Sequence, residues 1–135
     1  MSVIRKSVPP FSAKVTLGLE RGYSGEAIDE QEVIRYIQEL QDKQIREKSF
    51  YLSVSVSKCN IVLSGQYESH LILEFINYPR FPLDTDVLKK EIEWMTHQLM
   101  DKFEQNRTVI QYPDETVMFE KEKAIDPRII QGNKN

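Results

Sequence analysis

The segment from Phe50 to Ser57 constrains the fold most, because apolar and polar residues alternate along it without a break. Successive side chains of a strand point to opposite faces, so one face carries Phe50, Leu52, Val54 and Val56. The other face carries a tyrosine and three serines. A strand of this kind belongs to a sheet that is covered on one side only. Other parts of the chain must therefore supply the cover.

Two amphipathic helices are predicted to provide it. The first runs from about Glu30 to Arg46, after Asp29 and Glu32, whose spacing resembles a capping box with Asp in place of Ser or Thr. Its apolar residues recur at helical spacing, at Val33, Ile34, Ile37, Leu40 and Ile45.

The second helix is expected to start at a cap formed by Asp84 or Thr85 and to end near Gln105 and Asn106. Its stripe consists of Leu88, Ile92, Met95, Leu99 and Phe103. Each helix has one apolar side, so each can pack one side against a sheet.

Further strands are predicted at residues 14–20 and 70–77. Residues 108–112 and 116–119 form either a last strand with a kink or a final hairpin. Pro79 and Pro82 end the strand at 70–77, and since both follow aromatic residues their peptide bonds could be cis or trans.

The apolar phase changes between residues 58 and 65, where Ile61 and Leu63 fall on odd numbers. Either a bulge near Cys59 and Asn60 continues the strand, or a tight turn opens a separate short hairpin. We favour the bulged continuation. The sheet therefore has four or possibly five strands.

The element order β-α-β-β-α-β predicts an α+β fold, a ferredoxin-like two-layer sandwich of mostly antiparallel strands with both helices on one face. Residues 1–12 are an extended lead-in, residues 13–120 the single domain, and residues 121–135 a polar tail expected to be mobile. Over residues 13–119 this order resembles the small trimeric proteins of the PII-like and CutA families, which also have two βαβ halves and a long central hairpin. The resemblance lies in the element order alone.

The face of the sheet left without helices carries Tyr51, Ile72 and Ile76 among polar residues, which is too apolar for bare water. A homo-oligomer formed through this open face is the expected partner arrangement.

Composition excludes several classes of function. The net charge of −3 and the pI near 5.5, with no basic run, argue against nucleic-acid binding. No apolar stretch has the length of a signal peptide core or a membrane span, so we expect no membrane partner and a cytoplasmic location. The single cysteine, Cys59, excludes an intramolecular disulfide.

No chemical motif stands out, so no catalytic residue, cofactor or metal site is assigned. The two histidines, His70 and His97, lack the spacing of metal ligands. Speculative ligand-binding residues are Arg21 and Tyr23 in a glycine-bearing loop, Tyr78 and Arg80 beside two prolines, and Arg107 at the start of the last strand.

These features favour a non-catalytic module that self-assembles and binds a small ligand or a protein partner. The alternative is a small enzyme with an active site shared between subunits, built from residues among Tyr23, Glu68, His70, Arg80 and Arg107. The enzyme interpretation requires these side chains to share a common cleft, and the binding-module interpretation does not.

Overall fold

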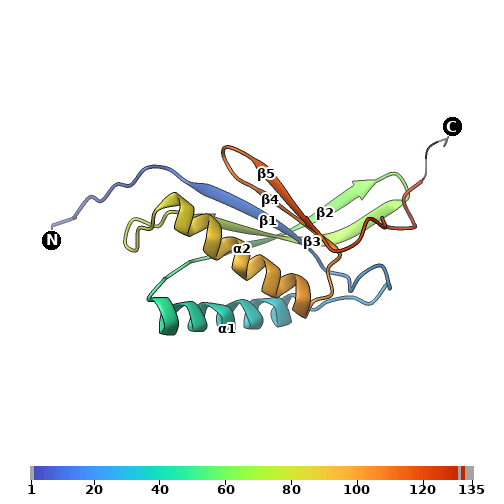
Figure 1. The fold of residues 1–135 in the computed structure, drawn as a ribbon, viewed down its shortest axis with the longest axis horizontal. Helices are drawn as coiled ribbons and strands as arrows, with labels where there is room; N and C mark the ends of the chain where they lie inside the picture. Colours follow the sequence, from blue (N-terminus) through green and yellow to red (C-terminus); the bar gives the residue numbers. More distant parts are fainter. Residues whose placement is uncertain (1, 131, 133–135) are drawn as a thin grey trace.

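The chain forms one five-stranded sheet with two helices on one face (Figure 1). The computed structural model describes residues 2–130 and 132. Its elements are β1 (Ser12–Gly18), α1 (Glu30–Lys48), β2 (Ser55–Leu63), β3 (Gln66–Ile76), α2 (Thr85–Lys102), β4 (Arg107–Gln111) and β5 (Thr116–Glu120). The strand order is β2-β3-β1-β4-β5, and every neighbouring pair is antiparallel. The predicted ferredoxin-like α+β sandwich is confirmed.

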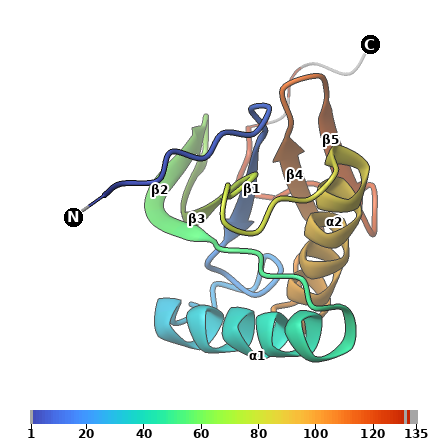
Figure 2. The ribbon, with the colours of Figure 1, turned by 90° about the vertical axis from the view of Figure 1, so that its left-hand side faces the viewer.

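The core lies between the helices and one face of the sheet. In the β1–β3 register Ala13 faces Phe75, Val15 faces Leu73 and Leu17 faces Leu71, and all six side chains are essentially inaccessible to water. Burying one aliphatic or aromatic side chain of the larger kind stabilises the fold by roughly 1.5–3 kcal/mol. Figure 2 views the two layers end on, with the sheet above α1.

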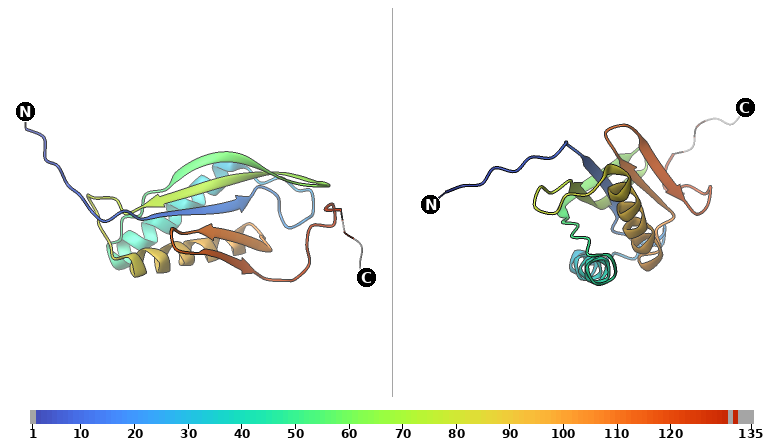
Figure 3. Two further views of the ribbon diagram at one scale, coloured as in Figure 1. Left: turned by 90° about the horizontal axis from the view of Figure 1, so that it is seen from above. Right: turned by 60° about the vertical axis from the view of Figure 1, so that its left-hand side comes forward.

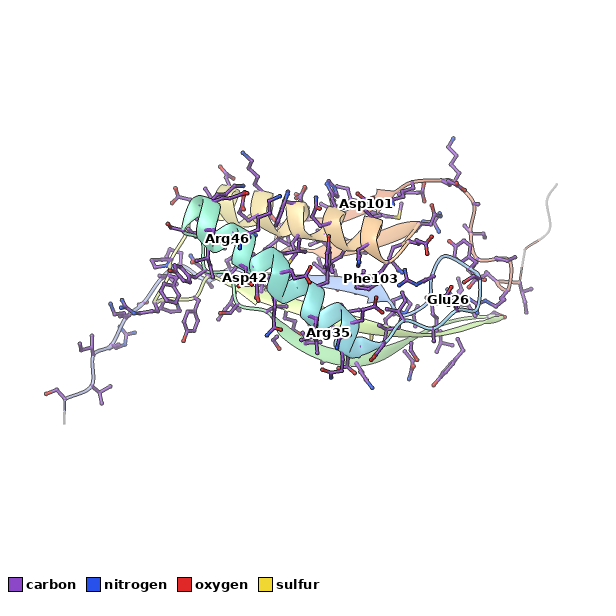
Figure 4. All side chains as sticks on the ribbon, turned by 90° about the horizontal axis from the view of Figure 1, so that it is seen from below. Glu26, Arg35, Asp42, Arg46, Asp101 and Phe103 are labelled. Carbon is purple, nitrogen blue, oxygen red and sulfur yellow. The ribbon has the colours of Figure 1, made fainter. Side chains whose placement is uncertain are left out.

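The helices cover this face with most of the predicted stripe residues, although Ile34 and Ile45 are only partly buried and the unpredicted Gln44 is buried. On α1 the buried residues are Val33, Ile37, Leu40 and Gln44. Arg35, Asp42 and Arg46 lie on the opposite side of the helix and point away from the sheet (Figure 4). The polar face of α1 is therefore its solvent face.

Both helix ends differ slightly from the prediction. The first helix continues two residues beyond Arg46 and ends at Lys48, and its C-cap Ser49 adopts left-handed backbone geometry and donates its amide to the last carbonyls. The second helix ends at Lys102, because Phe103 is its C-cap and Glu104 has a φ of 51°. The left-handed Glu104 reverses the chain, and β4 begins three residues later at Arg107.

The bulge expected near Cys59 is absent from the described structure. The β2–β3 register runs without a break from Ser55 opposite Glu74 to Leu63 opposite Gln66, and only Ser64 and Gly65 connect the strands. The phase change has another cause. The hairpin extends beyond the helices (Figure 3), so odd-numbered residues of its outer part carry apolar groups on the open face.

The alternation at residues 50–57 predicts the buried and exposed faces correctly, but it does not predict where the strand begins. Leu52 is buried and Val54 and Val56 pack against the core, as predicted. Strand β2 nevertheless starts only at Ser55, because its pairing with β3 stops at Glu74. The five residues before it are a connection that contributes apolar side chains without joining the sheet.

The last part of the domain is a hairpin. Strands β4 and β5 pair from Arg107 opposite Glu120 to Gln111 opposite Thr116, which supplies the fifth strand. The peptide bonds preceding Pro79 and Pro82 are both trans, since no cis bond occurs in the described residues.

Two terminal segments leave the sandwich in different ways. Residues 2–10 extend away from the sheet (Figure 1), with Val3 and Ile4 more than 80% exposed. Residues 121–130 instead turn back toward the β2–β3 hairpin, where the amide of Ile130 donates to the carbonyl of Ser64 at 2.9 Å. The predicted domain bounds and the mobility of the tail stay predictions.

The two helix N-caps give a matched test of capping. Asp29 accepts a hydrogen bond from the amide of Gln31 at 3.0 Å, whereas Asp84 makes no side-chain capping bond to the described residues. We expect Asp29→Ala to lower the free energy of unfolding by about 1 kcal/mol and Asp84→Ala to lower it by less. Urea denaturation measures both, and equal losses would contradict this assignment.

Candidate functional site

A cavity of about 390 Å³ opens on the helix-free face of the sheet, at the end where β1 finishes. Its floor comes from β1, β3 and β4, and its walls come from the loop after β1, the turn before β4 and the segment 121–130. The lining residues are Thr16, Gly22, Tyr23, Ile61, Gln66, Glu68, His70, Gln105, Asn106, Arg107, Val109, Asp126 and Ile129.

Strand β3 places the two titratable groups of the floor. Its odd-numbered residues from Leu71 onward face the core, so the even-numbered residues Gln66, Glu68 and His70 face the cavity. This alternation puts a carboxyl and an imidazole two residues apart on one face of one strand.

Gly18 at the end of β1 allows these groups to lie close to the backbone. A Cβ at this position would be 2.7 Å from Oε1 of Glu68 and 2.8 Å from Oε1 of Gln105. The amide of Gly18 donates to Gln105 Oε1, and Gln105 Nε2 donates to the carbonyls of Glu20 and Phe103. Gln105 thus fixes the end of β1 to the turn before β4.

Glu68 has an unusual proton affinity. Burial raises its pKa to about 7, and the carboxylates of Glu20 and Asp126 act in the same direction. Arg128 and the hydrogen bond from Gln66 partly oppose this rise. Near neutral pH, Glu68 can therefore be converted between its protonated and ionised forms by a small change in its surroundings.

His70 is held as a neutral ring. Burial lowers its pKa, and Nδ1 lies 3.2 Å from the carbonyl oxygen of Glu68. A carbonyl can only accept, so this contact requires the proton on Nδ1. In the neutral ring Nε2 is then a hydrogen-bond acceptor.

The side wall consists of Tyr23, Asn106 and Arg107. Asn106 donates to the carbonyls of Glu122 and Ala124 and accepts from the amide of Glu122. Arg107 forms an ion pair with Glu120 and also donates to Ala124 O at 3.2 Å. The polar groups of Asn106 and Arg107 are thus already used in hydrogen bonds within the protein. Of the three wall residues, Tyr23 has the weakest polar contacts, from its hydroxyl to Asn106 Nδ2 at 3.4 Å and to Ala124 O at 3.5 Å.

The cavity brings together most of the residues named for a shared enzyme site. Tyr23, Glu68, His70 and Arg107 all line it, whereas Arg80 does not. Among the residues singled out as ligand-binding, Tyr23 and Arg107 lie here.

Arg21 points elsewhere. Its guanidinium lies within 3.6 Å of Glu26, Glu32 and Glu104 and stacks over the ring of Phe103 at 5.7 Å. These contacts tie the loop after β1 to both helices (Figure 4 labels Glu26 and Phe103).

Tyr78 and Arg80 lie in the β3–α2 loop, at the other end of the sheet. Phe81 is the centre of this group, since it stacks on Tyr51 at 4.5 Å and contacts both Tyr78 and Arg80. The structure thus separates this pair from the cavity, and whether any of the five predicted residues binds a ligand stays a prediction.

Sequence analysis missed Glu20, Gln66, Asp126 and Arg128. Asp126 is 1% exposed and Glu20 8% exposed, and both accept from Arg128 Nη2, at 2.7 and 2.8 Å. Residues 20 and 126 are more than 100 positions apart, and no local pattern links them. The one local signal for this group is the polar character of the segment around Asp126.

Within residues 2–130 and 132, no group of three or more His, Cys, Asp or Glu side chains is arranged to hold a metal ion. Neither α1 nor α2 is long and apolar enough to cross a membrane.

Comparison with known proteins gives a likeness in fold only. No family model matches the chain, and no curated protein matches it in sequence. A phage SAM lyase in complex with S-methyl-5'-thioadenosine matches with a TM-score of 0.70 and 14% identity, over 93% of this chain and 100% of the other. A phage SAM lyase in the apo state matches with a TM-score of 0.69 and 13% identity, over 92% and 100%.

These matches correct the functional expectation. The main interpretation from sequence, a non-catalytic module, is wrong by this comparison, because both matching structures are enzymes. The finding favours the alternative, a small enzyme.

The raised pKa of Glu68 has a consequence for stability. A carboxyl whose pKa is higher in the folded chain than its ordinary 4.5 stabilises the fold below pH 4.5, and this contribution is lost as pH rises to about 7. We therefore expect Glu68→Gln, which stays neutral, to increase the free energy of unfolding more at pH 8 than at pH 5.

Chemical denaturation at the two pH values measures this difference. A ¹³C titration of the glutamate carboxyls, with Glu68→Gln assigning the signal, gives the pKa directly. An ordinary value near 4.5 would contradict the described environment.

Proposed function

We propose that this chain is a small enzyme that cleaves a sulfonium nucleoside of the S-adenosylmethionine (SAM) class in the cavity on the open sheet face. The observation that carries the proposal is the combination of an acidic cavity with this fold. The fold is the one shared with the phage SAM lyases, and the floor carries Glu68, with Asp126 and Glu20 adjacent.

The charge of the cavity suits a cationic substrate. Glu68 lies on its floor and Asp126 in its wall, and Glu20 is close enough to raise the pKa of Glu68. Arg128 is the cation paired with Asp126 and Glu20. SAM carries two positive groups, a sulfonium and an α-ammonium. A cation beside Glu68 would favour the ionised carboxylate and would be attracted by it.

The remaining surface suits the neutral parts of such a molecule. Ile61, Val109 and Ile129 supply apolar contacts, and Tyr23 supplies an aromatic ring at the mouth. Pockets for small molecules commonly combine a mostly apolar lining with a few polar groups, in volumes from about 300 Å³. The cavity has both properties.

The reaction requires the bond between sulfur and Cγ of the aminobutyrate chain to break, with its electron pair moving to sulfur. The nucleoside then leaves as the neutral thioether S-methyl-5'-thioadenosine. Cγ can be attacked by the substrate's own carboxylate, giving a lactone. Alternatively, a base can take a proton from Cβ, giving an alkene, and the Nε2 of a neutral His70 or the Glu68 carboxylate could accept that proton. Both routes balance without water or a redox partner.

The proposal keeps two expectations from the sequence, a cytoplasmic location and a homo-oligomer whose subunits share the site. The open face supports the latter, because Leu63, Ile76 and Met118 are each more than half exposed there. A second subunit packed on this face would cover them and complete the wall of the cavity.

The activity is tested by incubating the purified protein with SAM and following S-methyl-5'-thioadenosine by chromatography. We expect release of this product and a loss of at least about 100-fold in rate for Glu68→Gln, since a positioned acid–base or charged group commonly contributes that much. Mass analysis of the second product separates lactone from alkene.

Glu74→Gln is the matched control, because Glu74 is on the same strand and the same face and pairs with Lys14 at 3.8 Å. Its rate should equal that of the unmodified chain. Absence of both product and binding of SAM by calorimetry would rule out the proposed activity.

The oligomer is tested by light scattering at micromolar concentration. We expect a discrete oligomer that dissociates in the double variant Ile76→Glu/Met118→Glu, because charges replace apolar contacts on the open face. Val62→Glu is the control, since Val62 is 69% exposed on the opposite face of the same sheet. A monomer at every concentration would contradict the shared site.

A further inference from the structure

Residues 2–10, here called the arm, leave the sandwich without folding back on it (Figure 1). Val3 is 87% exposed and Ile4 is 82% exposed, so the arm holds two large apolar side chains in solvent. An extended segment has no neighbouring turn or strand that could shield such side chains from water. Because burial of apolar surface is favourable, the arm has a physical reason to bind a surface.

The base of the arm fixes its direction. Phe11 is buried, and its ring centroid lies 6.1 Å from that of Tyr112. The two residues before it, Pro9 and Pro10, each have a φ fixed near about −65° and favour a stiff, extended backbone. This stiff pair beside an anchored residue directs residues 2–8 away from their own chain, as Figure 3 shows. A surface that binds the arm therefore belongs to another molecule.

A groove of about 450 Å³ lies at the same end of the sandwich as the arm (Figure 1). The second half of α1 forms one wall and contributes Ile45, and residues 51–53 and Phe81 form the other. The side-chain amide of Gln41 donates to the carbonyl of Leu52 at 3.0 Å, which holds the two walls together. The groove is thus already formed in a single chain.

Three aromatic rings extend this groove. Tyr51 stacks on Phe81 with ring centroids 4.5 Å apart, and Tyr78 lies 6.1 Å from Phe81. The loop that carries two of the rings is closed by hydrogen bonds from the amide of Phe81 to Tyr78 O and from the amide of Leu83 to Asn77 Oδ1. The three aromatic residues are nevertheless 38% to 44% exposed. A stacked group of rings left this exposed is a typical anchor for a partner.

The arm carries two cations beside its apolar pair. Arg5 and Lys6 follow Ile4 directly, and residues 2–10 contain no acidic side chain. Neither cation forms an ion pair within the part of the chain that the structure describes. A segment with this order, two apolar residues and then two cations, suits a surface where an apolar groove meets carboxylates.

The groove is bordered by such carboxylates. Asp42 lines it, and Asp84 and Asp86 follow the β3–α2 loop at the start of α2. All three are exposed, and among the described residues none of them forms an ion pair. The cations beside them are Arg80 in that loop and Arg46, one helical turn after Asp42. Carboxylates are therefore in surplus around the groove, whereas the arm is purely basic.

We propose that the arm of one copy of this chain docks in the groove of a second copy, with Val3 and Ile4 against the aromatic rings and with Arg5 and Lys6 beside the carboxylates. Since arm and groove lie at the same end of the sandwich, two copies related by a two-fold axis can exchange their arms reciprocally. Nine extended residues span up to about 30 Å, which is enough to reach a neighbouring molecule. The exchange is independent of the proposed function, because the cavity lies at the other end of the sheet.

Paramagnetic broadening between chains measures the exchange. A nitroxide is attached to Ser2→Cys in a Cys59→Ser background, since Cys59 is the single native cysteine. This chain is mixed with an equal amount of unmodified, ¹⁵N-labelled chain. We expect the amide signals of Tyr51 and Phe81 in the ¹⁵N-labelled chain to lose intensity, whereas the signal of Ala124, at the cavity end, keeps its intensity.

Two arm variants test the apolar and the charged parts of the contact. In a titration with the spin-labelled chain, Ile4→Ser should raise the dissociation constant about tenfold, because one isoleucine side chain is no longer buried. Arg5→Glu/Lys6→Glu should abolish the broadening, and Asp42→Lys in the receiving chain should restore part of it. Lys123→Glu is the matched control, because it reverses an exposed charge in the segment that borders the cavity, and it should change neither result.

Three results would overturn the arm exchange. The first is full intensity of the Tyr51 and Phe81 signals in the mixed sample. The second is broadening that persists when a chain carrying both labels is diluted into unlabelled chain, since the arm would then occupy its own groove. The third is broadening that survives the charge reversal in the arm. Both arm variants change exposed side chains, so loss of the fold does not confuse their effect with loss of the contact.

Discussion

The structure depends on burial of a single face of the sheet. The register of β1 against β3 aligns six apolar side chains under the helices, from Ala13 with Phe75 to Leu17 with Leu71. Because side chains alternate, the same register commits the even-numbered residues of β3 to the other face. A slip of one residue would bury Glu68 and His70 and expose the core. The register of β1 against β3 therefore determines the position of the core and the position of the candidate site together.

The site also depends on where the strands end. Beyond Gly18 and Leu71 the helices no longer cover the sheet (Figure 3), and the chain there is made of turns and residues 121–130. Polar side chains can lie at such an end because backbone amides and carbonyls are available to bind them. Gln105 and Asn106 are examples, since each holds two separate segments through its side-chain amide. The result is a hydrogen-bonded rim around carboxyl groups that are only partly solvated.

The sequence predicts the element order well because each helix and strand produces its own local periodicity of apolar residues. The stripes of α1 and α2 and the faces of residues 50–57 need only neighbouring residues for their interpretation. The absent bulge shows the limit of that approach, since the phase change at Ile61 and Leu63 reports which part of the hairpin lacks helical cover.

The candidate site is predicted less well, because its contacts join distant segments. Tyr23, Glu68, His70 and Arg107 could be named by residue type, yet only the fold shows that they share a cavity and that Arg80 does not. Glu20, Asp126 and Arg128 form a group across 108 positions, and no spacing rule connects them. The contacts of Arg21 likewise depend on acidic residues from three segments of the chain, Glu26, Glu32 and Glu104.

Residues 2–10 and residues 121–130 lie at opposite ends of the sandwich (Figure 1), which matters for the design of reagents. Residues 2–10 leave the sheet beside Ser12 and Ile76, whereas residues 121–130 finish against Ser64, next to the cavity. An affinity tag or fluorescent protein joined at the N-terminus is therefore held away from the mouth of the cavity. The same fusion joined directly after residue 130 would load the segment that borders the carboxyl groups of Glu68 and Asp126. Reagents that report on the cavity are best built from the N-terminal side.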